Sequence, residues 1–277
     1  MTTAHAVEGP RPLHMGLPVS NGKLAMWLFL VTEIMFFTGL IGTYLVLRAA
    51  APSWPKPSDV HLSEAIGAIN TFVLICSSVT VVLAHWYLSH GEVKTSVLFI
   101  AATLALGGVF LIIKAIEYQA KFSHGILPGH VYERLDAPDG PDSLIQLSAD
   151  LSETLKHVPA ADVDVRVRLQ KFIDELPNMG PKTAAARLKV LHEEFSERVH
   201  LPPLIERGNM WASCYFAMTG FHALHVLGGL VVFIIMLLMA LGGRFGVEHA
   251  DMLELTGLYW HFVDIVWIFL FPLLYLV

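Results

Sequence analysis

The sequence predicts an all-α integral membrane protein with five transmembrane helices and an extramembrane helical insert. Hydrophobic residues make up 55% of the 277 residues, above the roughly 45–50% of a typical soluble domain. Five apolar runs reach the length of about 20 residues that a helix needs to cross the hydrocarbon core, namely 24–47, 65–88, 96–116, 211–241 and 255–277. We therefore predict an N-terminal tail (1–23), three spans (24–117), the insert (118–210) and two further spans (211–277).

The first run contains Glu33, which lies about 14 Å into a helix that rises 1.5 Å per residue and therefore near the middle of the membrane. A charged carboxylate at that depth costs about 2.5–3.5 kcal/mol. The sequence leaves two interpretations open. Glu33 is either a protonated hydrogen-bond donor that joins two helices, or a proton-active or lipid-contacting carboxyl.

The second and third runs carry polar residues near their ends. His85 lies beside Trp86 and Tyr87, as in the aromatic belts of membrane interfaces. Lys114 lies near the end of the third run, and we expect its long side chain to reach the interface.

The insert differs in composition from the spans, because residues 118–210 hold 11 of the 18 Lys and Arg and 14 of the 24 Asp and Glu. Apolar residues recur there at helical spacing in three stripes: Leu144, Leu147, Leu151 and Leu155; Leu169, Phe172, Ile173 and Leu176; Ala184, Leu188, Leu191, Phe195 and Val199. The sequence predicts three amphipathic helices. Because so small a core is marginal alone, we expect the stripes to dock on another surface.

The fourth run contains His222 and His225, whose spacing places them on one helix face. A pair on one face can ligate a metal or contact a haem edge, but a metal site needs three or four ligands, and no further ligand has a matching spacing. Gly220, Gly228 and Gly229 instead favour close helix packing.

The fifth run contains His261 and Asp264, also three residues apart and on one face. They can act as a proton relay. A mutually satisfied polar contact between helices is the favoured interpretation, because buried polar groups in lipid need partners.

Charges in the short loops predict the orientation. Arg11, Lys23, Lys94 and Arg244 fall on one side, and Arg48 and Lys56 fall on the other. The positive-inside rule then gives a cytoplasmic N-terminus, with the insert and the C-terminus outside.

Other features of the sequence argue against several classes of protein. Cys76 and Cys214 are too far apart for a redox motif, and no cleaved signal peptide is expected. With a net charge of −6, we expect no nucleic-acid partner.

Several segments resemble subunit III of the haem-copper oxidases. LFLVTEIMFFTG (28–39) resembles the family's buried-glutamate motif, and Glu117-Tyr118 resembles its S-E-Y motif. GFHALHV (220–226) and YWHFVDIVWIFL (259–270) are similar to G-F-H-G-L-H-V and Y-W-H-F-V-D-V-V-W-L-F-L. Ile69-Asn70-Thr71 and Ala84-His85 match the second family helix, so the matches cover all five runs in order.

The resemblance implies a subunit of cytochrome c oxidase with no catalytic centre, haem or copper of its own. Those cofactors are expected in partner subunits I and II, and phospholipid is expected to bind. Glu33 corresponds to the family's carbodiimide-reactive glutamate. The resemblance assigns buried polar roles, related to protons or lipid, to His85, Glu117, His222, His225, His261 and Asp264.

Two departures accompany the resemblance. The family's seven-helix form has two further N-terminal helices that help to form its lipid cleft, and the five runs here would need another subunit to supply them. The insert replaces a short loop, and we expect it to contact cytochrome c or another subunit.

The sequence leaves alternatives to a cytochrome c oxidase subunit in a prokaryotic inner membrane. Subunit III of a quinol oxidase and the accessory protein of nitric oxide reductase share the five-helix core. A stand-alone membrane carrier or enzyme using Glu33 and Asp264 is a different class. A carrier built from inverted repeats should show two similar halves, and this sequence shows none.

Overall fold

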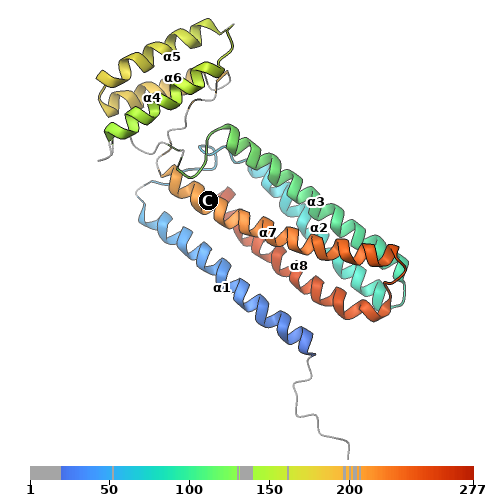
Figure 1. The fold of residues 1–277 in the computed structure, drawn as a ribbon. Helices are drawn as coiled ribbons and strands as arrows, with labels where there is room; N and C mark the ends of the chain where they lie inside the picture. The colour runs from blue at the N-terminus through green and yellow to red at the C-terminus, as the bar shows by residue number, and fades with distance from the viewer. Residues whose placement is uncertain are drawn as a thin grey trace, which may run out of the picture.

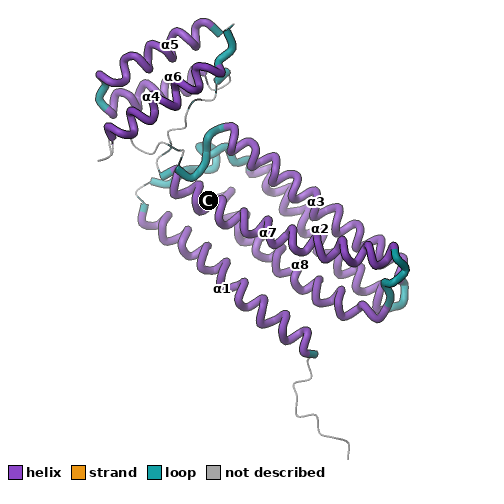
Figure 2. The backbone as a smooth tube through the Cα atoms, viewed as in Figure 1, coloured by secondary structure: helices purple, strands orange, loops and turns teal. Residues whose placement is uncertain are grey.

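The computed structural model describes residues 20–51, 53–129, 131, 140–160, 162–195, 198–199, 201, 205 and 207–277. Residues 1–19 of the predicted tail lie outside this part of the chain. The helices are α1 (Asn21–Ala50), α2 (Glu64–Ser89), α3 (Val93–Ser123), α4 (Gly140–His157), α5 (Val163–Glu175), α6 (Pro181–Phe195), α7 (Gly208–Leu241) and α8 (Ala250–Phe271). Short 3₁₀ turns follow α5 (Leu176–Asn178) and precede α8 (Val247–His249), and a π-helical turn, Pro272–Leu276, follows α8. Figure 2 shows only helices and loops in the described residues.

The five predicted spans correspond to α1, α2, α3, α7 and α8, which are long and apolar enough to cross a membrane. Serine side chains cap two of them, since Ser20 accepts a hydrogen bond from Lys23 N (3.3 Å) and Ser63 from Ile66 N (3.4 Å). Helix α3 continues to Ser123, past the predicted end of its run at residue 116. Glu117 therefore lies within the helix.

The long helices lie side by side, and α1 is the least embedded of them (Figure 1). In the apolar central stretch of α1 only 6% of the residues are buried, against 50% in that of the last span. Polar contacts hold α1 near both of its ends: Lys23 pairs with Glu254 of α8 at 2.8 Å, and Arg48 donates to the carbonyl of Val277, which follows the π-helical turn after α8. Because the spans alternate in direction, the insert and the end of α8 lie on the same side of the bundle, as predicted.

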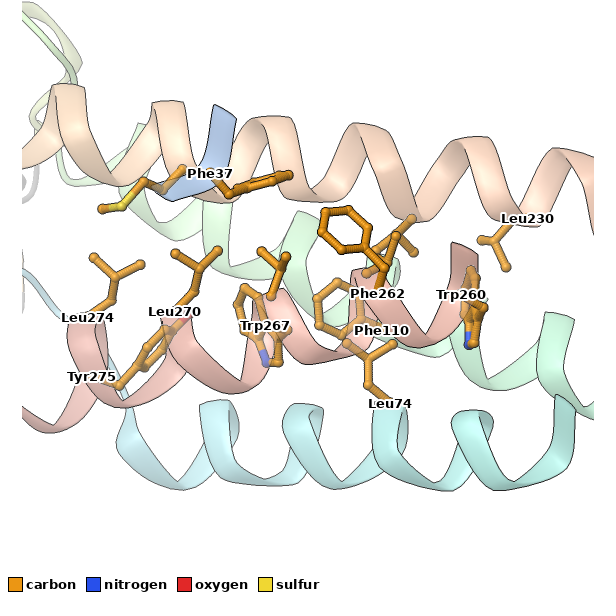
Figure 3. Packing of buried hydrophobic residues seen from close by; sticks show 14 of the residues in the cluster. Phe37, Leu74, Phe110, Leu230, Trp260, Phe262, Trp267, Leu270, Leu274 and Tyr275 are labelled. Carbon is orange, nitrogen blue, oxygen red and sulfur yellow. The ribbon is translucent and has the colours of Figure 1, made fainter. Parts of the chain in front are cut away.

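Large aromatic side chains fill the bundle between α2, α3, α7 and α8 (Figure 3). Trp260 lies against two glycines. A Cβ atom at Gly107 would lie 2.9 Å from its ring, and one at Gly229 would lie 2.6 Å from it. The close approach predicted around Gly229 is confirmed.

The insert has a hydrophobic core of its own, formed by α4, α5 and α6. The predicted stripes face one another there, and Leu147, Leu151 and Leu169 are at most 1% exposed. The expectation that the stripes dock on another surface is therefore wrong, because folding of the insert already buries them.

The two connections of the insert meet at Asn209. Its Oδ1 accepts hydrogen bonds from Gly129 N (2.9 Å) and Val131 N (3.1 Å), and its Nδ2 donates to Val131 O (2.7 Å). The chain thus enters and leaves the insert at nearly the same place.

Candidate functional site

Glu33 and His225 connect α1 to α7 within the spans. Glu33 Oε2 lies 3.0 Å from His225 Nε2, and the two side chains are 20% and 15% exposed. His225 Nδ1 lies 2.7 Å from the Phe221 carbonyl oxygen. Since a carbonyl only accepts, Nδ1 carries a hydrogen and Nε2 faces the carboxyl. A contact at 3.0 Å then requires one proton between Glu33 and His225, on either group.

His222 does not join His225 in a common site. It points into the bundle, is 1% exposed, and packs against Phe110 and Trp267 at ring-centroid distances of 5.6 and 5.0 Å. The described residues contain no group of three or more His, Cys, Asp or Glu placed to hold a metal ion.

His261 and Asp264 meet Ser78 of α2 instead of each other. His261 Nδ1 lies 2.5 Å from Ser78 Oγ, and the Asp264 carboxyl lies close to the same hydroxyl, although its Oδ1 has no hydrogen-bond partner among the described residues. Asp264 is 6% exposed. The predicted His–Asp contact is therefore corrected to one bridged by a serine, which joins α8 to α2.

Glu117 belongs to a buried polar network near the insert side of the bundle. Lys114 Nζ donates to Glu117 Oε1 (2.9 Å), Tyr215 OH (3.1 Å) and Tyr275 OH (3.0 Å). Both tyrosine hydroxyls donate to the Glu117 carboxylate, Tyr275 at 2.6 Å. This closed set of four side chains, the Lys114 network, joins α3, α7 and the turn after α8.

Lys114 is 3% exposed, so the expectation that it reaches the membrane interface is wrong. An ammonium has three N–H donors, and the network uses all three. Lys121, about two turns further along α3, is also buried and donates to the Val60 carbonyl. The sequence alone does not single out Tyr215 or Tyr275 as polar partners. Only the i,i+3 spacing of Lys114 and Glu117 pointed to the network.

His85 lies in the last turn of α2, where Ser89 Oγ donates to the His85 carbonyl at 2.9 Å. Trp86 beside it is 51% exposed. This surface position agrees with an interfacial belt.

The fold and these buried contacts define the class of protein. It is an all-α, multi-pass membrane protein whose spans are joined by buried carboxyl, imidazole, lysine and tyrosine groups. A family model described as cytochrome c oxidase subunit III matches residues 11–132 and 199–277. The matched ranges contain all five spans and exclude residues 133–198, which hold α4, α5 and α6.

Three relatives show the extent of the similarity. The chain is 24% identical to a probable cytochrome c oxidase subunit 3 of Mycobacterium leprae over 275 residues, which is 99% of this chain and 92% of that protein. It is 26% identical to cytochrome c oxidase subunit 3 of Corynebacterium diphtheriae, over 90% of this chain and 84% of that one. For the same subunit of Tetraodon nigroviridis, identity is 26% over 97% of this chain and 74% of that one. The chain therefore belongs to the cytochrome c oxidase subunit III family of the haem-copper oxidases.

Proposed function

We propose that this chain is a subunit without a redox centre of its own, which supports proton-coupled electron transfer and oxygen reduction by its neighbours. The Glu33–His225 contact carries the proposal. It holds one proton near the middle of α1, where two helices meet and both side chains keep some exposure. A carboxyl and an imidazole that share a proton form a group able to accept or release it without moving far.

The proposed partners are oxidase subunits I and II, which hold the haem and copper, together with bound phospholipid. Support comes from the family match across all five spans and from α1, whose apolar face is mostly open, with Leu28, Met35 and Val46 at least 62% exposed. Surface of that kind needs lipid or another membrane protein against it.

The proposed electron donor is cytochrome c. The relatives are named cytochrome c oxidase subunit 3, which favours this donor over quinol and over a role beside nitric oxide reductase. We propose a prokaryotic inner membrane as the location, and the loop charges support an N-terminus in the cytoplasm with the insert outside.

Substitution of Glu33 tests the proposed role. Glu33→Gln keeps a hydrogen bond to His225 and should preserve assembly, but it should impair proton-coupled turnover because an amide cannot exchange the proton. Glu33→Leu should also weaken assembly. The control is Glu254→Gln, which alters a carboxylate of α8 that pairs with Lys23 at the start of α1. Co-purifying subunits, oxygen consumption and proton release are measured. Normal proton release by a fully assembled Glu33→Gln oxidase would contradict the role, and a chain that purifies stably without partners would contradict the subunit assignment.

The insert is proposed to contact cytochrome c or another subunit through its polar exterior, since its stripes are buried. Exposed ion pairs such as Arg168–Glu194 (2.7 Å) and Arg187–Glu175 lie on that exterior. Replacing residues 133–198 with a short linker should leave the spans inserted, because each satisfies its own backbone hydrogen bonds. It should slow association of the donor or loosen a subunit, with an effect that shrinks as salt rises. Unchanged donor kinetics and subunit content would contradict this role.

A further inference from the structure

The His222 imidazole lies in the aromatic interior of the bundle. Its neighbours Phe110 and Trp267 are fully buried (Figure 3). Within the described part of the chain, neither ring nitrogen of His222 has a hydrogen-bond partner. His225 is three residues further along the same helix, and both of its ring nitrogens have contacts. A position on α7 therefore does not by itself explain why His222 lacks partners and His225 has them.

A buried imidazole without partners is expensive. A neutral ring has one N–H donor and one acceptor nitrogen, and each unpaired buried group costs about 1–3 kcal/mol. Native proteins pair more than about 90% of their buried polar groups. The Phe110 ring lies nearly perpendicular to the imidazole, at 77°, and its face can accept at most one N–H. The acceptor nitrogen still needs a donor.

A second unpaired group lies in the same layer of the bundle, which is the level of His222, Phe110 and Trp267. Asn70 is 1% exposed, and its Nδ2 donates to the Phe110 carbonyl at 3.5 Å, but its Oδ1 has no partner among the described residues. Trp267, which contacts His222, donates from Nε1 to Thr71 Oγ1 at 3.0 Å. The layer therefore includes α2, α3, α7 and α8, with an unpaired nitrogen on α7 and an unpaired oxygen on α2.

We propose that His222 and Asn70 bind an internal water molecule. The ligand must be small, because the layer is closed by side chains with almost no exposed surface. It must also donate and accept hydrogen bonds. The unpaired groups are an acceptor nitrogen and an N–H of the His222 ring, and the acceptor Oδ1 of Asn70. Water meets both conditions, and a buried water typically makes about three hydrogen bonds to such groups. This site is independent of the proposed function.

A high-resolution cryo-EM map of the intact oxidase tests the site directly. The expected result is a density peak about 2.6–3.2 Å from a ring nitrogen of His222, on the side facing Asn70. A map that resolves buried waters elsewhere in the same complex, but shows no peak there, would overturn the proposal.

Variants of the intact oxidase give a second test. His222→Phe and Asn70→Leu should each lower the Tm by about 2–4 °C, because each leaves the water and the other side chain short of a partner. The double variant should lose less than the sum of the two. Phe233→Leu, a packing change at a fully buried site on α7, is the control for lost volume. In a dry site, an apolar ring of similar shape would remove an unpaired group, so an unchanged or raised Tm for His222→Phe would overturn the proposal.

Discussion

Replacing Lys114 with methionine should destabilise the insert side of the bundle. The Lys114 and Glu117 side chains are 4% and 11% exposed, so water screens the pair little. Without Lys114 the Glu117 carboxylate keeps, among the described residues, the donors of Tyr215 and Tyr275. Removal of one partner of a buried ion pair costs about 3–5 kcal/mol. Because the two tyrosines remain, we expect a loss of about 3 kcal/mol, the lower end of that range.

The double variant Lys114→Met/Glu117→Gln should recover most of that loss. It removes both charges, and replacement of a whole buried pair is often close to neutral. The glutamine can still accept a hydrogen bond from a tyrosine and donate one. We expect a coupling free energy of about 2 kcal/mol between the two positions, within the usual range for side chains in contact.

Detergent-induced unfolding of the purified oxidase, followed by tryptophan fluorescence, measures both variants. Trp211 and Trp267 are buried against Tyr215 and Lys114 of the network, so their emission reports on this end of the bundle. Lys94→Met, which alters an exposed lysine near the start of the same helix, is the matched control. The reasoning is refuted if Lys114→Met unfolds at the same midpoint as Lys94→Met, or if the effects of Lys114→Met and Glu117→Gln simply add.

Three further variants test packing in both parts of the chain. Gly107→Ala should lower the melting temperature, because the new Cβ would lie 2.6 Å from Leu230 and 2.9 Å from Trp260, whereas Gly108→Ala meets nothing within 4 Å and should be neutral. Leu151→Ala should cost the insert about 2–5 kcal/mol and expose it to limited proteolysis while the spans stay intact; equal protection of both proteins would argue against a separate core. Asn209→Ala should speed hydrogen exchange at the amides of Gly129 and Val131, which it now binds, and unchanged exchange would show that other contacts hold the connection.

The five spans could be predicted because their cause is local. A helix in lipid satisfies its backbone hydrogen bonds within one segment, so length and apolar composition are enough to find it. Boundaries were less certain, because polar residues can continue a helix past the apolar run. The stretch from Glu117 to Ser123 shows this, since it remains helical in α3.

The partners of polar side chains could not be predicted, because they come from distant segments. Sequence periodicity places Lys114 and Glu117 on one face, but it does not show that Tyr215 and Tyr275 meet them there. The expectation that Lys114 reaches the interface failed for this reason. His261 and Asp264 illustrate the same limit, since the expected partner of each lay on α8 and the observed one, Ser78, lies on α2.

The insert shows how an amphipathic pattern identifies a helix without identifying what the helix covers. Its three stripes predicted α4, α5 and α6, yet a stripe is equally suited to a partner protein and to the other helices of its own domain. The structure selects the second, because the stripe residues form one separate core. The family model does not match residues 133–198. Asn209 holds the two connections of the insert together. An insertion with its own core and closely spaced ends can be added to a five-helix bundle without repacking the spans. The surface that it leaves for a partner combines exposed ion pairs such as Arg168–Glu194 with exposed apolar side chains such as Ile145 and Val163.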